Sequence, residues 1–101
     1  MFCKDCSLVQ LDRDFNLKYM FGKNYGYRSG INNTMSKHLK SLVNKISKKF
    51  FIKKNDYVLD IASNDGTLLN SYDKNIIKVG IDPLVNKFKK NYKKINYKIS
   101  N

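Results

Sequence analysis

The sequence lacks the features by which several common classes of protein are recognised. It has no run of about 18 apolar residues, which a membrane-spanning helix needs. Its first ten residues, MFCKDCSLVQ, lack the basic end and the apolar stretch of a secretory signal. The dinucleotide-binding motif GxGxxG is also absent. We therefore expect a cytoplasmic chain without a membrane partner, and we disfavour a dinucleotide-binding domain.

Arginine and acidic residues are scarce. Only 2 of the 20 basic residues are arginine, and 8 acidic residues leave a net charge of +12. A charge of this size suggests an anionic partner such as nucleic acid. The lysines are scattered, however, and the accompanying excess of Asn and Ile is typical of AT-rich coding sequence. We therefore interpret most of the charge as solvated surface and keep a basic nucleic-acid-binding module as the alternative.

The apolar pattern changes after residue 28. Residues 1–28 predict irregular structure, whereas the next segment predicts a helix over 31–50 with one apolar face. Ser29, Asn32 or Asn33 can cap the start of this helix. Its apolar stripe is expected to lie in the core and consists of Met35, Leu39, Leu42, Val43, Ile46 and Phe50.

Strands and helices alternate in the rest of the chain. YVLDIA (57–62) and IIKVGID (76–82) predict buried strands, with a short helix over 66–72 between them. A second helix, over 83–92, begins at Pro83, and INYKIS (95–100) begins a third strand. This order predicts an α/β fold whose parallel strands are joined by right-handed crossovers, as in part of a Rossmann-like domain. So few strands suggest the front part of a larger protein.

The segment DIASNDG (60–66) leaves the first predicted strand at its carboxyl end, where open parallel sheets bind ligands. Small residues in it let a ligand approach the backbone, and the following helix directs amide groups to the same place. Asp82 ends the next strand, 22 residues after Asp60, and is placed to accept hydrogen bonds from ribose hydroxyls. The alternative is an ordinary turn with an accidental aspartate.

The two carboxylates of this segment narrow the class of ligand. Asp60 and Asp65 would repel a pyrophosphate, whereas they attract a ligand that carries an amine and a sulfonium. The residues therefore favour S-adenosylmethionine over NAD as the cofactor.

Four stretches together resemble the class I S-adenosylmethionine-dependent C-methyltransferases with a zinc-binding N-terminal domain, the deoxysugar C-methyltransferase type. They are CKDCSLVQL (3–11), NYGYRSGINNTMSKHL (24–39), VLDIASNDGTLL (58–69) and VGIDPLVN (79–86). The resemblance implies a remnant of the zinc-binding domain with a linker over 1–28. It implies the N-terminal part of the Rossmann-like cofactor domain over 29–101. The first CxxC pair and the catalytic half of such enzymes are not present.

The resemblance implies a role for each matched position. The loop over 60–66 holds the amino-acid part of the cofactor, Asp82 binds the ribose, and the YGYRSG segment lies over the cofactor or the mouth of the substrate site. Ala62 stands where the family usually has Gly. The implied cofactor-binding set is Tyr27, Ser29, Asp60, Ala62, Ser63, Asn64, Gly66, Asp82 and Pro83.

Cys3 and Cys6 form a CxxC pair. In a cytoplasmic chain such a pair indicates metal binding or redox chemistry rather than a structural disulfide, and no strand precedes it, which disfavours redox chemistry. The resemblance implies half of a structural zinc site made of four cysteines, and such a site needs four ligands. A missing partner segment or a second copy of the chain would have to supply the others.

The implied reaction is methylation at carbon of a nucleotide-linked keto-sugar or a similar small molecule. It needs a general base beside the reacting carbon and a group that stabilises the oxyanion. Tyr25, Tyr27 and His38 are the candidates in this chain. We expect the main base to lie outside these residues, and the chain alone to be inactive.

Overall fold

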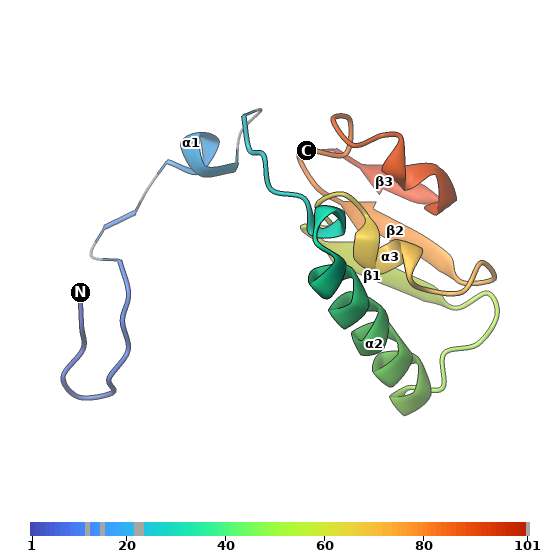
Figure 1. The fold of residues 1–101 in the computed structure, drawn as a ribbon, viewed down its shortest axis with the longest axis horizontal. Helices are drawn as coiled ribbons and strands as arrows, with labels where there is room; N and C mark the ends of the chain where they lie inside the picture. The colour runs from blue at the N-terminus through green and yellow to red at the C-terminus, as the bar shows by residue number, and fades with distance from the viewer. Residues whose placement is uncertain (12, 15, 22–23, 101) are drawn as a thin grey trace.

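An extended N-terminal segment leads into a small α/β unit in the computed structural model, which describes residues 1–11, 13–14, 16–21 and 24–100 (Figure 1). The α/β unit contains a parallel sheet of three strands in the order β1-β2-β3. The strands are β1 (Tyr57–Ile61), β2 (Ile77–Ile81) and β3 (Tyr97–Ile99). The predicted α/β class and the parallel pairing are therefore confirmed, at the level of a small three-stranded unit.

The helices are mostly short. They are α1 (Leu17–Phe21), α2 (Asn33–Lys49) and α3 (Thr67–Asn70), with 3-10 turns η1 (Ser29–Ile31) and η2 (Asn91–Lys94). The Asn32 side chain caps α2, because its Oδ1 accepts hydrogen bonds from the amides of Thr34 and Met35 at 2.8 and 3.3 Å. Asn32 is thus the cap among the three candidates. Within the described residues, no helix has the length and apolar character that a bilayer crossing requires.

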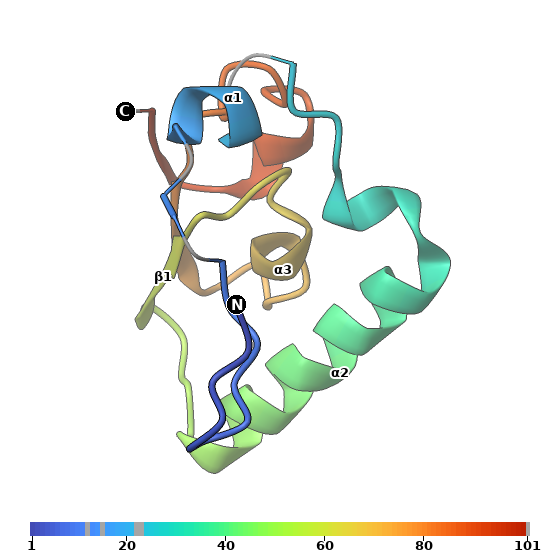
Figure 2. The ribbon, with the colours of Figure 1, turned by 90° about the vertical axis from the view of Figure 1, so that its left-hand side faces the viewer.

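All the helical structure of the α/β unit lies on one side of the sheet. Figure 2 shows α3 between β1 and α2. Helix α3 contacts the strands β1 and β2 as well as α2 and η2. The main core lies in this layer and consists of Leu69, Leu84, Val85, Phe88, Tyr92 and Ile95. Two right-handed connections that advance in the same direction place their helices on one face, so the strand order accounts for this arrangement.

The opposite face of the sheet is bare. Alternate strand residues point away from the helices, and five large apolar side chains on this face are exposed: Tyr57, Leu59, Ile61, Tyr97 and Ile99. Parallel sheets are normally covered on both faces.

Two expectations about helices are wrong. The segment predicted as a helix over 83–92 forms turns up to residue 90 and then η2. Several amides of this segment bond to the carbonyl three residues earlier, as Val85 does to Asp82 at 3.2 Å and Asn91 does to Phe88 at 2.8 Å, which gives turns tighter than those of an α-helix. In the stripe of α2 only Val43 is fully buried, and Phe50 is 66% exposed. The reason is that α2 packs on the short α3 rather than on the sheet itself.

Candidate functional site

The loop after β1 is the most unusual stretch of backbone in the α/β unit. The Ser63 amide donates to the Ile81 carbonyl at 3.1 Å, which extends the β1–β2 ladder into the loop. Ala62, Asn64 and Gly66 then have φ angles of 63°, 50° and 76°. Left-handed backbone costs a residue other than glycine about 1 kcal/mol. A loop that keeps two such residues is a candidate for function.

Asp82 joins the carboxyl ends of β1 and β2. Its Oδ2 accepts a hydrogen bond from the Asn64 amide at 2.8 Å, and its Oδ1 accepts one from the Leu84 amide at 2.7 Å. The residue is only 6% exposed. Each carboxylate oxygen has a second lone pair, so these bonds leave Asp82 able to accept a hydrogen bond from a ligand hydroxyl group at the same edge of the sheet.

Asp60 lies beside Asp82 and is half-buried. Burial raises the pKa of its carboxyl group, and the neighbouring Asp82 carboxylate raises this pKa further. In the part of the chain that the structure describes, the Asp60 carboxylate makes no hydrogen bond or ion pair. Two carboxylates near one strand end create a negative potential that favours a cationic group such as an ammonium or a sulfonium.

The segment before α2 lies over this loop. The Ser29 amide donates to Asn64 Oδ1 at 3.1 Å, and Asn64 Nδ2 donates to the Tyr27 carbonyl at 3.1 Å. The Tyr25 ring lies 6.4 Å from the Tyr27 ring. These residues therefore meet the predicted loop although about 35 positions separate them in sequence.

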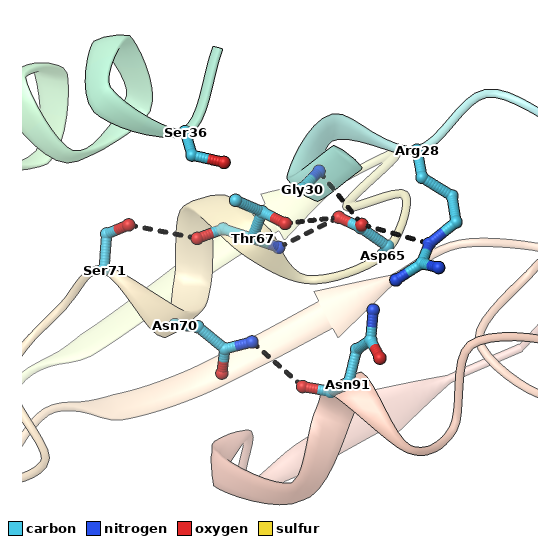
Figure 3. Close-up of a pocket in the computed structure, with 8 residues that line it drawn as sticks. All are labelled: Arg28, Gly30, Ser36, Asp65, Thr67, Asn70, Ser71 and Asn91. Atoms are coloured by element: carbon cyan, nitrogen blue, oxygen red, sulfur yellow. Dashed lines mark hydrogen bonds and ion pairs between the residues drawn. The ribbon is translucent and has the colours of Figure 1, made fainter. Parts of the chain in front are cut away.

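Asp65, which we expected to attract the cofactor together with Asp60, is engaged in contacts within the chain. It is fully buried and accepts hydrogen bonds from the Gly30 amide at 3.1 Å, the Thr67 amide at 3.2 Å and the Thr67 hydroxyl at 2.6 Å (Figure 3). Arg28 Nε lies 3.5 Å from its Oδ2. The carboxylate satisfies amides at the start of α3 and in η1, so its function is to hold the two segments together.

A polar pocket opens beside this ion pair (Figure 3). Hydroxyl, amide, carboxylate and guanidinium groups from α2, α3, η1 and η2 surround it. Its lining residues are Arg28, Gly30, Ser36, Asp65, Thr67, Asn70, Ser71 and Asn91. The pocket contains none of the implied cofactor-binding residues, so it lies next to the predicted site rather than in it.

Tyr92 supports the loop from the core side, and no sequence motif pointed to this residue. Its side chain is completely buried, its hydroxyl donates to the Asn64 carbonyl at 2.6 Å, and Ser63 Oγ lies 2.8 Å from the same hydroxyl. Gly80 leaves room for this ring, because a Cβ there would lie 3.0 Å from Tyr92 Cε1. A glycine inside a predicted strand was the available signal that another group comes close.

Burial raises the pKa of Tyr92 from 10.0 to about 12. In the unfolded chain the phenol ionises near pH 10, so between pH 10 and about 12 the unfolded state binds fewer protons than the folded state. We expect the free energy of unfolding to fall as the pH rises through this range. Urea unfolding at a series of pH values measures this fall. The Tyr92→Phe variant has no phenol to ionise at this position, so it should lose less stability over the same pH range. An equal loss would contradict a raised pKa for Tyr92.

The remaining predicted residues do not converge on one point. Ala62 and Pro83 are exposed beside the loop, and His38 is exposed on α2. Tyr25 is half-buried against the core, and its carbonyl accepts a hydrogen bond from Lys87 Nζ at 2.7 Å. The tyrosines thus lie in the segment that covers the loop, whereas His38 belongs to the surface of a helix.

Cys3 and Cys6 lie on a hairpin turn in the N-terminal segment. Phe2 and Val9 form an antiparallel bridge, and the Cys3 amide donates to the Leu8 carbonyl at 2.9 Å. Hydrogen bonds from the amides of Cys6 and Asp5 lower the pKa of the Cys3 thiol. Among the residues that the structure describes, no three His, Cys, Asp or Glu side chains are close enough to hold a metal ion.

Comparisons with models of known protein families and with curated proteins found no match to this chain.

Proposed function

We propose that this chain is the cofactor-binding part of an S-adenosylmethionine-dependent methyltransferase. The observation that carries the proposal is the pair Asp60 and Asp82, which lie together at the carboxyl ends of two parallel strands next to a loop with left-handed backbone. Ligands bind at this edge of open parallel sheets. A cofactor that combines an amine, a sulfonium and a ribose matches the charge and the hydrogen-bonding capacity of the two carboxylates.

Each part of the site has a separate task in this proposal. Asp82 accepts hydrogen bonds from the ribose, and the unpaired Asp60 carboxylate attracts the positive charge of the cofactor. The small side chains of Ala62 and Ser63 let the cofactor approach the backbone. When bound, the cofactor supplies a methyl group that can be transferred to a nucleophile.

The acceptor in this proposal is a nucleotide-linked keto-sugar or a similar small molecule. Tyr25 and Tyr27 lie in the segment that covers the loop, where they are placed to orient an acceptor. The general base comes from outside the described residues, so methyl transfer is not expected from this chain alone. Binding of the cofactor product is therefore the appropriate test.

Isothermal titration with S-adenosylhomocysteine tests the cofactor site directly. We expect the purified chain to bind, and Asp60→Asn to bind about tenfold or more weakly because a charge-assisted contact to the ligand amine is lost. Asp60 makes no hydrogen bond within the described residues, so this change leaves the loop intact. Asp73→Asn is the matched control. Asp73 lies in the turn that precedes β2 at the opposite end of the sheet, and its Oδ1 accepts from the Asn75 amide, which an asparagine can still do.

Two results would contradict the proposal. One is an absence of binding by a chain that circular dichroism shows to be folded. The other is equal affinity of the wild type and Asp60→Asn, because the ligand would then bind elsewhere.

One observation favours the alternative, a basic module that binds nucleic acid. A hollow beside Phe88 is lined by five cationic side chains: Arg28, Lys87, Lys89, Lys90 and Lys98. Contacts between such cationic side chains and phosphate groups give an affinity for nucleic acid that falls steeply as the salt concentration rises. Titration with a DNA duplex at low and at high salt separates the two functions, since tight, salt-sensitive binding to the duplex without binding of S-adenosylhomocysteine would favour the alternative.

A further inference from the structure

Two cavities meet at Arg28. The polar pocket of Figure 3 has a volume of about 390 Å³, and the hollow beside Phe88 has a volume of about 720 Å³. Arg28 and Asn91 line both cavities, and Figure 3 shows these two side chains pointing toward one another. Cavities of this size hold small molecules, so one ligand can extend from the first cavity into the second.

The guanidinium group of Arg28 is held in place from two sides. Its Nε is buried and lies 3.5 Å from Asp65 Oδ2, and its Cζ lies 5.3 Å from the centre of the Phe88 ring, which attracts the cation. Within the described residues, the two terminal nitrogens of Arg28 make no hydrogen bond. They are therefore available for the parallel pair of hydrogen bonds by which arginine binds a phosphate or carboxylate group.

The hollow supplies net positive charge. Asp65 neutralises Arg28, but the exposed side chains of Lys89, Lys90 and Lys98 also line the hollow. Among the described residues that line it, none is acidic. Several cations around one arginine attract a dianion more strongly than a monoanion, and a phosphate monoester carries nearly two negative charges at neutral pH. The hollow thus favours a phosphate group over a single carboxylate.

The polar pocket offers hydrogen-bonding groups without net charge, since Asp65 and Arg28 neutralise one another. The Ser36 hydroxyl and the Asn91 side-chain amide make no hydrogen bond within the described residues. Asn70 donates through its Nδ2 to the Asn91 carbonyl at 2.9 Å, which leaves its Oδ1 as an acceptor. Hydroxyl and amide groups both donate and accept hydrogen bonds. They match the hydroxyl groups of a ligand, which also do both.

We propose that the two cavities together bind a phosphate monoester of a small hydroxylated molecule. Arg28 and the three lysines bind the phosphate group, and the polar pocket binds the hydroxyl groups. The proposal does not depend on the proposed cofactor site, because Asp60 and Asp82 line neither cavity.

Titration with glucose 6-phosphate, inorganic phosphate and glucose tests the two halves of this site. We expect isothermal titration to give glucose 6-phosphate an affinity about tenfold or more above that of inorganic phosphate, because only the ester also bonds to the polar pocket. Glucose alone should give no detectable binding at the same concentrations. Amide chemical shifts should change at residues 28–30, 36, 70–71 and 89–91.

Two variants assign the halves to their residues. Lys90→Gln should weaken the binding of both phosphate compounds about threefold, as expected for the loss of one exposed ionic contact, whereas Ser36→Ala should weaken only the binding of glucose 6-phosphate. Lys54→Gln is the matched control, since Lys54 lies in the turn before β1 and lines neither cavity. It should keep both affinities. None of the three residues belongs to the core, and circular dichroism checks that each variant is folded.

Any of three results would overturn the proposal. They are equal affinities for inorganic phosphate and glucose 6-phosphate, affinities that neither Lys90→Gln nor Ser36→Ala changes, and shifts at residues 28–30 and 89–91 that a DNA duplex causes but glucose 6-phosphate does not. The last result would assign the hollow to nucleic acid. Titration of Ser36→Ala with S-adenosylhomocysteine, which should bind as it does to the wild type, separates failure of this inference from failure of the proposed function.

Discussion

Replacement of Asp65 by alanine is expected to lower the free energy of unfolding by about 3 kcal/mol. The fully buried carboxylate accepts three hydrogen bonds from Gly30 and Thr67 and lies 3.5 Å from Arg28 Nε. An alanine leaves these donors without the carboxylate that joins η1 to α3. The segment that contains Tyr27 and Ser29 should then separate from the loop, so affinity for S-adenosylhomocysteine should fall together with stability.

Urea unfolding measures the loss, and amide chemical shifts of residues 27–31 show whether the segment has separated. Asp73→Ala is the control, since Asp73 is exposed and its carboxylate accepts a hydrogen bond from the Asn75 amide of its own turn; it should cost well under 1 kcal/mol. A loss from Asp65→Ala that is no larger than that of the control would show that the carboxylate is not the group that holds η1 to α3.

Gly80→Val is expected to destabilise the chain by about 2–3 kcal/mol through overpacking. A Cβ at this position would lie 3.0 Å from each of three atoms, Leu69 Cδ1, Ser63 Oγ and Tyr92 Cε1. All three residues are buried, and Ser63 and Tyr92 are hydrogen-bonded to one another at 2.8 Å. The ring cannot move without breaking its bond to the Asn64 carbonyl, so the strain should reach the loop.

Gly26→Val provides the matched control, because a Cβ at Gly26 meets no atom within 4 Å. We expect its thermal midpoint to stay close to that of the wild type, whereas Gly80→Val should unfold at a clearly lower temperature. Since valine is favoured over glycine in strands, an unchanged or raised midpoint for Gly80→Val would mean that the layer above β2 repacks freely.

The sequence was sufficient to predict the parts of the fold that depend on local pattern. The apolar segments 57–62 and 76–82 correspond to β1 and β2, and the helical spacing of apolar residues corresponds to α2. These features rest on periodicity and on motifs read within single segments.

Features that depend on contacts between distant segments could not be predicted in this way. Nothing in the sequence distinguishes Asp65 from Asp60. Asp65 is engaged in an internal network, whereas Asp60 makes no hydrogen bond or ion pair within the described residues; the difference arises because Arg28 and Gly30 pack on the loop. Tyr92 and its hydrogen bonds were missed for the same reason. The helix predicted over 83–92 is replaced by turns in which amides bond to the carbonyl three residues earlier, as Asn91 does to Phe88.

The one-sided layering of the sheet has a consequence for how the fold can be extended. A strand added beside β3 by another right-handed connection would place its helix on the face that is already covered, whereas a strand added beside β1 would reverse the direction of the chain and bring its helix to the bare face. β1 is therefore the point at which the strand order has to turn back. The loop with Ala62 and Asn64 leaves the sheet at that strand, so it would lie at the mouth of the crevice between two diverging helical layers.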